Sequence, residues 1–252
     1  MILAFETSTA TGGVALLETD GPGGPPKRLL GSVHFTSPTL HGQRLLPCVE
    51  WLLDRAGRTL ADVSAVAVAR GPGSFTGLRI GLAAAKALAH TRGVPLLGID
   101  TLAALAARVA WGGVAPGAWI CPVLDARQGE VYTALHRAAP AGTPHTPWLP
   151  EPPRHGAGHA GPLLAWADRV AELTSAVADG GDTSPVTFAG EGLTRLPARL
   201  RGVFGPRFAA APALRAQSTA EEIACLAAAR LARGEHDDAY TLVPDYWSRS
   251  GR

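Results

Sequence analysis

Charged residues and cysteine are scarce in this chain of 252 residues. Charged residues make up 17% of it, against roughly 25% in an average globular protein, and the 23 Lys and Arg nearly balance the 21 Asp and Glu. The formal net charge of +2 excludes a global field that captures nucleic acid. The three cysteines, Cys48, Cys121 and Cys225, lie far apart and lack the spacing of zinc ligands, so we expect a reducing compartment and no structural metal.

We expect neither a leader nor a membrane span from the sequence. The first six residues contain no basic residue and end in Glu6 after a short apolar run, which is unlike a signal peptide or an anchor. The charge-free stretch at residues 109–124 is broken by glycine and proline, and it is shorter than the ~20 apolar residues that cross a bilayer. We therefore expect a cytoplasmic protein with no membrane contact.

Apolar residues are abundant enough for a full-sized core. They make up 46% of the chain, and a chain of this length buries roughly 70–75% of its extended surface on folding. At roughly 150 residues per domain, the length corresponds to about 1.7 domains, which means one large domain or two modest ones. Whole-chain disorder and a miniature fold that depends on disulfides are both excluded.

The pattern of apolar runs predicts an α/β fold with sheets of mixed direction. In the first half, strands are expected at residues 2–5, 13–17, 29–35, 65–69 and 95–100, with helices at 41–56, 77–91 and 101–109. In the second half, strands are expected at 119–125, 130–136 and 185–189, a loop at 138–162, and helices at 163–174 and 219–233. We expect an N-terminal lobe at 1–108 joined by the helix at 219–233, a C-terminal lobe at 109–218, and a tail at 234–252.

A similar strand and turn begins each half of the chain. Thr7-Ser8-Thr9 follows the first strand, and Asp125-Ala-Arg127-Gln-Gly129 follows the first strand of the second half. One such turn is uninformative, but two in corresponding places are typical of a two-lobed nucleotide clamp.

The helix expected after Gly77 is apolar all round, which is typical of a helix buried on more than one side. One side of this helix must cover the sheet, and Gly77 and Gly81 lie on the opposite side. Each helical glycine costs about 0.8–1.0 kcal/mol of helix stability relative to alanine. Close backbone approach would offset this cost, either on the chain's own sheet or against another polypeptide. The helix at 41–56 favours a partner, because its apolar surface exceeds one stripe. That stripe comprises Leu45, Val49, Leu52 and Ala56.

Three further motifs carry weaker signals. Gly71 and Gly73 could cradle an anion on backbone N–H groups or form a simple turn, and no Walker lysine follows them. His155 and His159 have the i, i+4 spacing of metal ligands, but the glycines and prolines around them disfavour the helix that this spacing needs. Five arginines without a neighbouring acid could contact phosphates or form a solvated edge. They are Arg195, Arg199, Arg201, Arg207 and Arg215.

Five segments together resemble the bacterial TsaB (YeaZ-like) family. They are residues 2–9 (ILAFETST), 41–43 (HGQ), 70–81 (RGPGSFTGLRIG), 125–132 (DARQGEVY) and 189–192 (AGEG). The string at 70–81 is long and specific, and the resemblance covers residues 1–135 well and the remainder loosely. It implies an actin-like, sugar-kinase/Hsp70 type fold of two related lobes, and a part in making threonylcarbamoyladenosine at position 37 of tRNA.

The resemblance further implies a non-catalytic subunit without cofactor or metal. In the family this subunit pairs with its catalytic paralogue TsaD, an ATPase named TsaE joins them, and tRNA is contacted at most indirectly. A homodimer through the same face is expected when the subunit is alone. The pairing surface consists of two helices that map to residues 41–56 and 77–91. The implied interface residues are His41, Leu45, Val49, Leu52, Gly77, Gly81, Ala84, Lys86 and Leu88.

The resemblance also implies a set of loop residues around a possible vestigial nucleotide site. They are Glu6, Thr7, Ser8, Thr9, Arg70, Gly71, Gly73, Asp125, Arg127 and Glu130. The family usually has aspartate where this chain has Glu6, and in active members of the superfamily that aspartate serves the metal–nucleotide site. The longer carboxylate therefore argues against independent ATP hydrolysis. An autonomous actin-like ATPase or small-molecule kinase stays the alternative.

Overall fold

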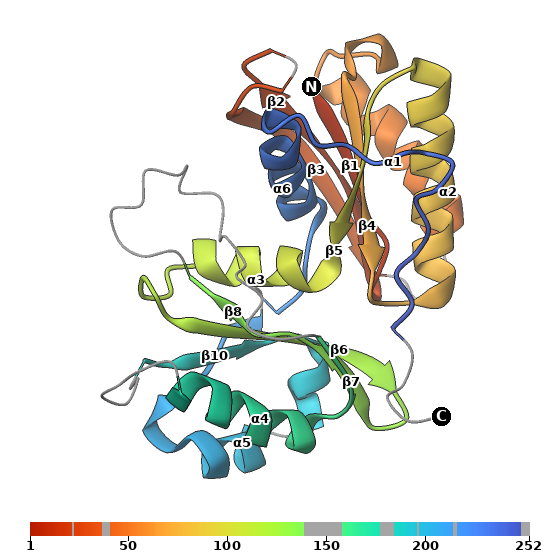
Figure 1. Ribbon diagram of the computed structural model, residues 1–252. Helices are drawn as coiled ribbons and strands as arrows, with labels where there is room; N and C mark the ends of the chain where they lie inside the picture. The colour runs from red at the N-terminus through yellow and green to blue at the C-terminus, as the bar shows by residue number, and fades with distance from the viewer. Residues whose placement is uncertain are drawn as a thin grey trace. The chain divides into compact units, whose positions relative to one another are not determined.

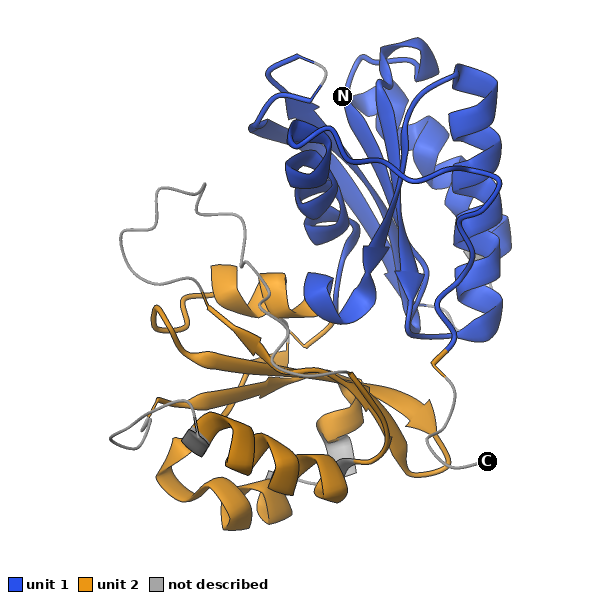
Figure 2. Cartoon of the chain, in the orientation of Figure 1, with its two compact units in different colours: residues 1–104, 218–246 blue, residues 105–217, 247–252 orange. Residues whose placement is uncertain are grey.

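The computed structural model (Figure 1) describes residues 1–21, 23–36, 41–138, 158–176, 184–195, 197–213 and 216–247. His155 and Arg215 lie outside the described residues. The chain divides into two compact units: unit 1 contains residues 1–104 and 218–246, and unit 2 contains residues 105–217 and 247–252 (Figure 2). Each unit is described by itself below.

Unit 1 is built on a five-stranded mixed sheet in the order β3-β2-β1-β4-β5. Its strands are β1 (Ile2–Glu6), β2 (Thr11–Thr19), β3 (Pro26–Thr36), β4 (Ala65–Gly71) and β5 (Leu96–Asp100). The central strand β1 pairs antiparallel with β2 and parallel with β4. All five of its residues are buried, which is typical of a strand covered on both faces.

Helices cover both faces of this sheet, with α1 (His41–Arg55) and α2 (Phe75–Arg92) on one face and α6 (Ala220–Ala232) on the other (Figure 1). A short 3₁₀ turn, η1 (Leu60–Asp62), follows α1. Helix α2 begins after Ser74, whose hydroxyl accepts a hydrogen bond from the Gly77 N–H, and ends at Gly93 in the left-handed conformation. Helix α6 begins with a capping box of Thr219 and Glu222, as the sequence predicts.

Unit 2 repeats this strand order: written in the same direction as for unit 1, it is β9-β7-β6-β10-β11, and β8 pairs with β6 beside this row. Its strands are β6 (Trp119–Arg127), β7 (Glu130–Thr133), β8 (His136–Arg137), β9 (His159–Pro162), β10 (Val186–Ala189) and β11 (Phe208–Ala210). Its helices are α3 (Thr101–Trp111), which starts in unit 1, α4 (Leu163–Ala176), η2 (Glu191–Arg195), α5 (Pro197–Phe204) and η3 (Gly205–Arg207). As in unit 1, antiparallel pairs lie on one side of the first strand and parallel pairs on the other.

The shared strand order confirms the predicted α/β class with two related lobes of mixed sheet. Residues 159–162 were expected within a loop, but they form β9 because β7 supplies a ladder of hydrogen bonds for them. Residues 234–246 belong to unit 1, where Asp237 donates its N–H to the Leu96 carbonyl at 2.8 Å. Among the described residues, none of the helices has the length and apolar character needed to cross a bilayer.

Candidate functional site

The apolar stripe of α1 faces the core of unit 1. Leu45, Val49 and Leu52 are only 1–3% exposed, and they belong to one buried cluster with the sheet residues Phe5 and Val14. This corrects the sequence-based assignment of these three residues to a partner interface, because the chain's own sheet already covers them. The side chain of His41 lies outside what the structure describes.

Gly77 and Gly81 allow α2 to lie against the turn that follows β1. A Cβ on Gly77 would stand 2.0 Å from the Thr7 carbonyl oxygen, and a Cβ on Gly81 would stand 2.2 Å from Thr7 Oγ1. Thr7 Oγ1 in turn donates a hydrogen bond to the Gly77 carbonyl at 2.8 Å. The cost of both helical glycines is therefore offset within unit 1. Of the two interpretations left open by the sequence, the structure shows close approach within the chain.

The outward surface of the two helices still exposes apolar side chains. Leu46 and Trp51 on α1 are 49% and 54% exposed. On α2, Ala83 and Ala87 are exposed, while Ile80, Ala84, Lys86 and Leu88 are half-buried. The two helices pack side by side on one face of the sheet (Figure 1), so their outward positions lie on the same side of unit 1. We call this outward side of α1 and α2 the outer helix face, and its exposed or half-buried apolar residues include Leu46, Trp51, Ile80, Ala83, Ala84 and Ala87.

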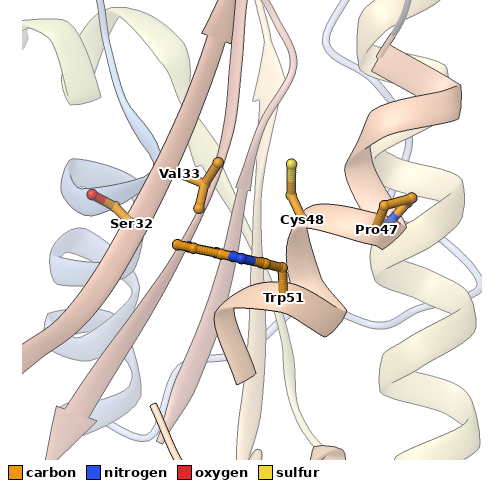
Figure 3. A pocket seen from close by; sticks show the side chains of 5 residues that line it. All are labelled: Ser32, Val33, Pro47, Cys48 and Trp51. Atoms are coloured by element: carbon orange, nitrogen blue, oxygen red, sulfur yellow. The ribbon is translucent and has the colours of Figure 1, made fainter. Parts of the chain in front are cut away.

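A groove of about 460 Å³ adjoins the outer helix face, between β3 and α1. Its walls are Ser32 and Val33 from β3 and Pro47, Cys48 and Trp51 from α1, and the Trp51 ring reaches from the helix toward Val33 (Figure 3). Burial raises the pKa of the Cys48 thiol, which favours the neutral form. The groove therefore extends the apolar character of the outer helix face toward the sheet edge.

Glu6 ends β1 and is fully buried. Its Oε1 accepts hydrogen bonds from the Ser8 N–H at 2.6 Å and the Ser8 hydroxyl at 2.5 Å, and its Oε2 accepts one from the Ser218 hydroxyl at 2.7 Å. Burial raises the pKa of Glu6, the hydrogen bonds from Ser8 and Ser218 oppose the rise, and the charge of Glu222 adds to it. Both carboxyl oxygens are thus occupied by donors from the same unit.

The loop before α2 packs on the same turn. The Ser74 N–H donates to the Ser8 carbonyl at 2.6 Å, and a Cβ on Gly73 would stand 2.4 Å from that oxygen. A Cβ on Gly71, at φ +123°, would stand 2.5 Å from the Asp245 carbonyl oxygen. These glycines therefore serve close loop packing, which favours the turn over the anion cradle among the two alternatives for this loop.

Arg70 and Thr9 complete the group of loop residues in unit 1. The Arg70 carbonyl accepts a hydrogen bond from the Asp245 N–H at 2.7 Å, which ties β4 to the segment after α6. The Thr9 hydroxyl donates to the Thr11 carbonyl at 3.1 Å and so shapes the turn between β1 and β2. The structure thus brings Glu6, the three hydroxyl residues and the loop at 70–73 into one cluster.

The corresponding residues of unit 2 lie in the hairpin between β6 and β7. Asp125 Oδ1 accepts a hydrogen bond from the Arg127 N–H at 2.8 Å, and Arg127 adopts a positive φ of 66° in the turn. Glu130 begins β7 opposite Arg127. Burial raises the pKa of Glu191, which follows β10, and the charge of Asp125 adds to the rise while Arg127 opposes it. Asp125, Arg127 and Glu191 are therefore close enough to interact.

Sequence reasoning missed Ser218, Glu191 and Trp51. Glu191 lies in the segment 189–192, which resembles a family motif, but the sequence did not indicate that it interacts with Asp125 and Arg127. Ser218 is 212 residues from Glu6, and no local pattern reports such a pairing. Trp51 lies outside the apolar stripe of α1, and a large aromatic residue at such a position is the signal that the sequence offered. The structure shows it to be 54% exposed.

Metal-ligating side chains do not cluster in the described part of the chain, where no group of three or more His, Cys, Asp or Glu residues is placed to hold an ion. His159 lies in β9, and its ring stacks on Trp166 with centroids 5.4 Å apart. This contact gives His159, one of the two histidines at the i, i+4 spacing, a packing role.

Sequence comparison finds one family model and several curated relatives. The model is that of TsaD, tRNA N6-adenosine threonylcarbamoyltransferase, and it matches residues 36–140. The tRNA threonylcarbamoyladenosine biosynthesis protein TsaB of Escherichia coli is 38% identical over 152 residues, 57% of this chain and 58% of that protein. The protein of the same name from Bacillus subtilis is 37% identical over 136 residues, 54% and 55% of the two chains. The chain thus matches a little over half the length of these curated relatives.

Comparison of structures extends the similarity to nearly the whole chain. YeaZ from Pseudomonas aeruginosa has a TM-score of 0.72 and 31% sequence identity, and the alignment covers 98% of this chain and 99% of that one. The resemblance therefore includes both units and not only the segment that the sequence comparisons align.

Proposed function

Since the chain belongs to the TsaB/YeaZ family, we propose that it takes part in forming threonylcarbamoyladenosine at position 37 of tRNA. Two relatives named for this biosynthesis share more than a third of the aligned residues with it, and the family model of the transferase TsaD matches its middle part. On this proposal the chain is an accessory subunit that activates TsaD, and TsaD transfers the threonylcarbamoyl group.

The observation that carries the non-catalytic role is the occupied carboxyl group of Glu6. A carboxylate that organises a metal–nucleotide complex must be ionised and must present free oxygens to the ion. Glu6 instead has a raised pKa and receives three hydrogen bonds from Ser8 and Ser218. Recruiting it to a metal would break a buried network, so we assign Glu6 a structural role.

The outer helix face is the surface that we propose for the partner. Full burial of a leucine is worth about 1.5–3 kcal/mol, so covering the exposed half of Leu46 gives about 1 kcal/mol. Covering the exposed half of Trp51, at up to ~250 Å² for the whole side chain, gives about 3 kcal/mol at 25 cal/mol per Å². Ala83 and Ala87 allow a partner helix to approach α2 closely. These gains offset part of the cost of association.

The proposed partner at this face is TsaD, and TsaE joins the assembled pair in the cytoplasm. Without TsaD, two copies of the chain pair through the same face, because the apolar surface of Leu46 and Trp51 is then left in water. Homodimer and heterodimer therefore compete for one surface. The proposal further holds that tRNA is bound mainly by the partner.

The substitution Leu46→Glu tests the proposal. It places a charge within the proposed contact at a half-exposed side chain outside the buried cluster of unit 1, so we expect at least ~30-fold weaker association with TsaD. The measurement is co-elution of the two purified proteins in size-exclusion chromatography, together with formation of threonylcarbamoyladenosine in a tRNA transcript. Complex formation and tRNA modification should fall together.

Leu29→Glu is the matched control, because Leu29 is similarly exposed at 42% but belongs to β3 and not to either helix of the proposed surface. It should bind TsaD as the unchanged protein does. Equal complex formation by the Leu46→Glu and Leu29→Glu proteins would contradict the proposed surface. Modification of tRNA by the chain in the absence of TsaD would contradict the accessory role.

A further inference from the structure

Arginines without acidic neighbours gather in one segment of unit 2. Between Gly192 and Ala220 the sequence has five arginines and no acid. Three of them have described side chains: Arg199 and Arg201 lie on α5, and Arg207 lies in η3. These two elements precede β11, the strand at the edge of the sheet. We call the surface formed by these three residues the arginine edge.

The arginine edge stands on a well-packed base. Leu200 and Phe204 of α5 are 0% and 5% exposed. The rings of Phe204 and Phe208 both pack on Phe188 of β10, with centroid distances of 5.1 and 5.7 Å. The backbone that carries the arginines is therefore fixed by the core of unit 2, and less conformational entropy is lost when these residues bind a ligand.

Two of the three guanidinium groups are themselves positioned by uncharged neighbours. Arg201 lies over the Phe208 ring, with Cζ 5.6 Å from its centroid, and Arg207 Nε donates to the Ser184 carbonyl at 3.1 Å. Within the described residues, no carboxylate forms an ion pair with Arg199, Arg201 or Arg207. Among the described residues these three cations therefore have no carboxylate counter-ion, and a bound anion would supply one.

The spacing of the arginines indicates an extended anion and not a single small one. Successive helical residues are rotated by about 100°, so Arg199 and Arg201 lie on opposite flanks of the buried Leu200 and cannot converge on one phosphate. Arginine binds phosphate oxygens in a bidentate manner with its planar fork of N–H donors. Separated guanidinium groups on a firm surface suit the repeated phosphates of a nucleic acid strand.

We propose that the arginine edge of unit 2 binds the phosphate backbone of RNA. The choice of RNA over an acidic polypeptide rests on the proposed function, because a subunit of a tRNA-modifying complex acts beside a polyanionic substrate. The arginine edge would then hold the tRNA in register, while the bases are read elsewhere. This contact would add directly to a tRNA affinity otherwise supplied by the partner.

The test compares the full chain with the double variant Arg199→Gln/Arg201→Gln in binding a fluorescent unmodified tRNA transcript across a range of salt concentrations. Losing two phosphate contacts should weaken binding about 10-fold at low salt and make the slope of log K against log salt shallower by about 1.5. Arg169→Gln/Arg233→Gln is the matched control: it removes the same charge from two exposed arginines paired with glutamates, and should bind normally.

Arg199→Lys/Arg201→Lys separates charge from folding, because it keeps both cations: it should keep the salt slope of the unchanged chain and bind tRNA more tightly than the glutamine variant, although it loses the guanidinium fork. Equal RNA affinity and salt slope for the glutamine variant and the control would overturn the proposal. So would poly-glutamate that competes as well as tRNA does, since that result assigns the surface to an acidic polypeptide. Co-elution of the glutamine variant with TsaD is measured in parallel, so that failure of the proposed function and failure of this inference are distinguished.

Discussion

Alanine at Gly77 tests whether α2 needs its glycines for packing within unit 1. The new Cβ would stand 2.0 Å from the Thr7 carbonyl oxygen, about 1 Å closer than the 3.0 Å that real Cβ atoms respect. A backbone carbonyl cannot rotate away without moving the turn after β1, so we expect an overpacking cost of about 1–3 kcal/mol. The higher helix propensity of alanine offsets about 0.8–1.0 kcal/mol of that cost. The net loss should be up to about 2 kcal/mol.

The assay is thermal unfolding followed by circular dichroism. For a chain of this size a loss of 1 kcal/mol lowers the melting temperature by roughly 2–4 °C, so Gly77→Ala should melt lower than the unchanged protein by up to roughly 8 °C. Gly81→Ala should lose less, because the clashing Thr7 Oγ1 can rotate and give up its hydrogen bond to the Gly77 carbonyl. The melting temperature should therefore be lowest for Gly77→Ala, higher for Gly81→Ala and highest for the unchanged protein.

Gly42→Ala is the control, since a Cβ at Gly42 in α1 would meet only the Ile80 Cδ1 at an ordinary 3.7 Å. It should leave the melting temperature unchanged or raise it slightly, through the same gain in helix propensity. If Gly77→Ala melted as high as Gly42→Ala, the explanation by close approach to Thr7 would be refuted. The glycine at position 77 would then be available for an intermolecular contact.

Three other predictions concern buried polar groups and a thiol. Burial alone would raise the pKa of Glu221, but hydrogen bonds from His34 and two hydroxyls outweigh it and lower the pKa to about 2. The ionised carboxylate therefore stabilises the fold above pH 4.5, and this stabilisation is lost as the pH falls toward 2. Discounted for partial exposure this amounts to about 1–2 kcal/mol, and Glu221→Gln should flatten the acid limb of the urea midpoint against pH; an unaltered limb would contradict it. Ser218→Ala removes the donor to Glu6 Oε2 and should cost about 1–3 kcal/mol in urea unfolding, whereas a neutral result would deny the network a structural role. Thiol reagents should label Cys48 first, since Cys121 and Cys225 are buried and burial raises their pKa values to about 11 and about 12. Bound TsaD should slow the labelling of Cys48. The Cys48→Ser variant shows whether Cys121 and Cys225 are protected in the free chain.

The local signals of the sequence determined most of the secondary structure. The apolar run at residues 2–5 predicts a buried strand, and β1 is buried throughout. The capping pattern at Thr219 predicts the start of α6, because both of its hydrogen-bonding groups lie within one helical turn. Strand ends were less predictable: residues 13–17 were expected where β2 covers Thr11–Thr19, because the ladder continues as long as a neighbouring strand offers partners.

The candidate loop cluster was found from the sequence only in part. Glu6, Thr7 and Ser8 form one contiguous motif, so their proximity follows from the chain itself. Ser218 completes the hydrogen bonds of Glu6 from the far end of the sequence, and no spacing rule connects residues so distant. The sheet and α6 bring them together, so this partnership is a property of the tertiary structure.

The sequence by itself determined that α1 and α2 are apolar beyond one stripe and that α2 carries two glycines at a cost. It could not determine what covers each stripe, because periodicity fixes which residues share a helix face but not the direction in which that face points. Only the tertiary structure decided that Leu45, Val49 and Leu52 face the sheet and that Gly77 meets Thr7, a residue 70 positions earlier. The physical reason is that burial is settled between elements that meet only after folding, so the face left for a partner is the one that the core does not use.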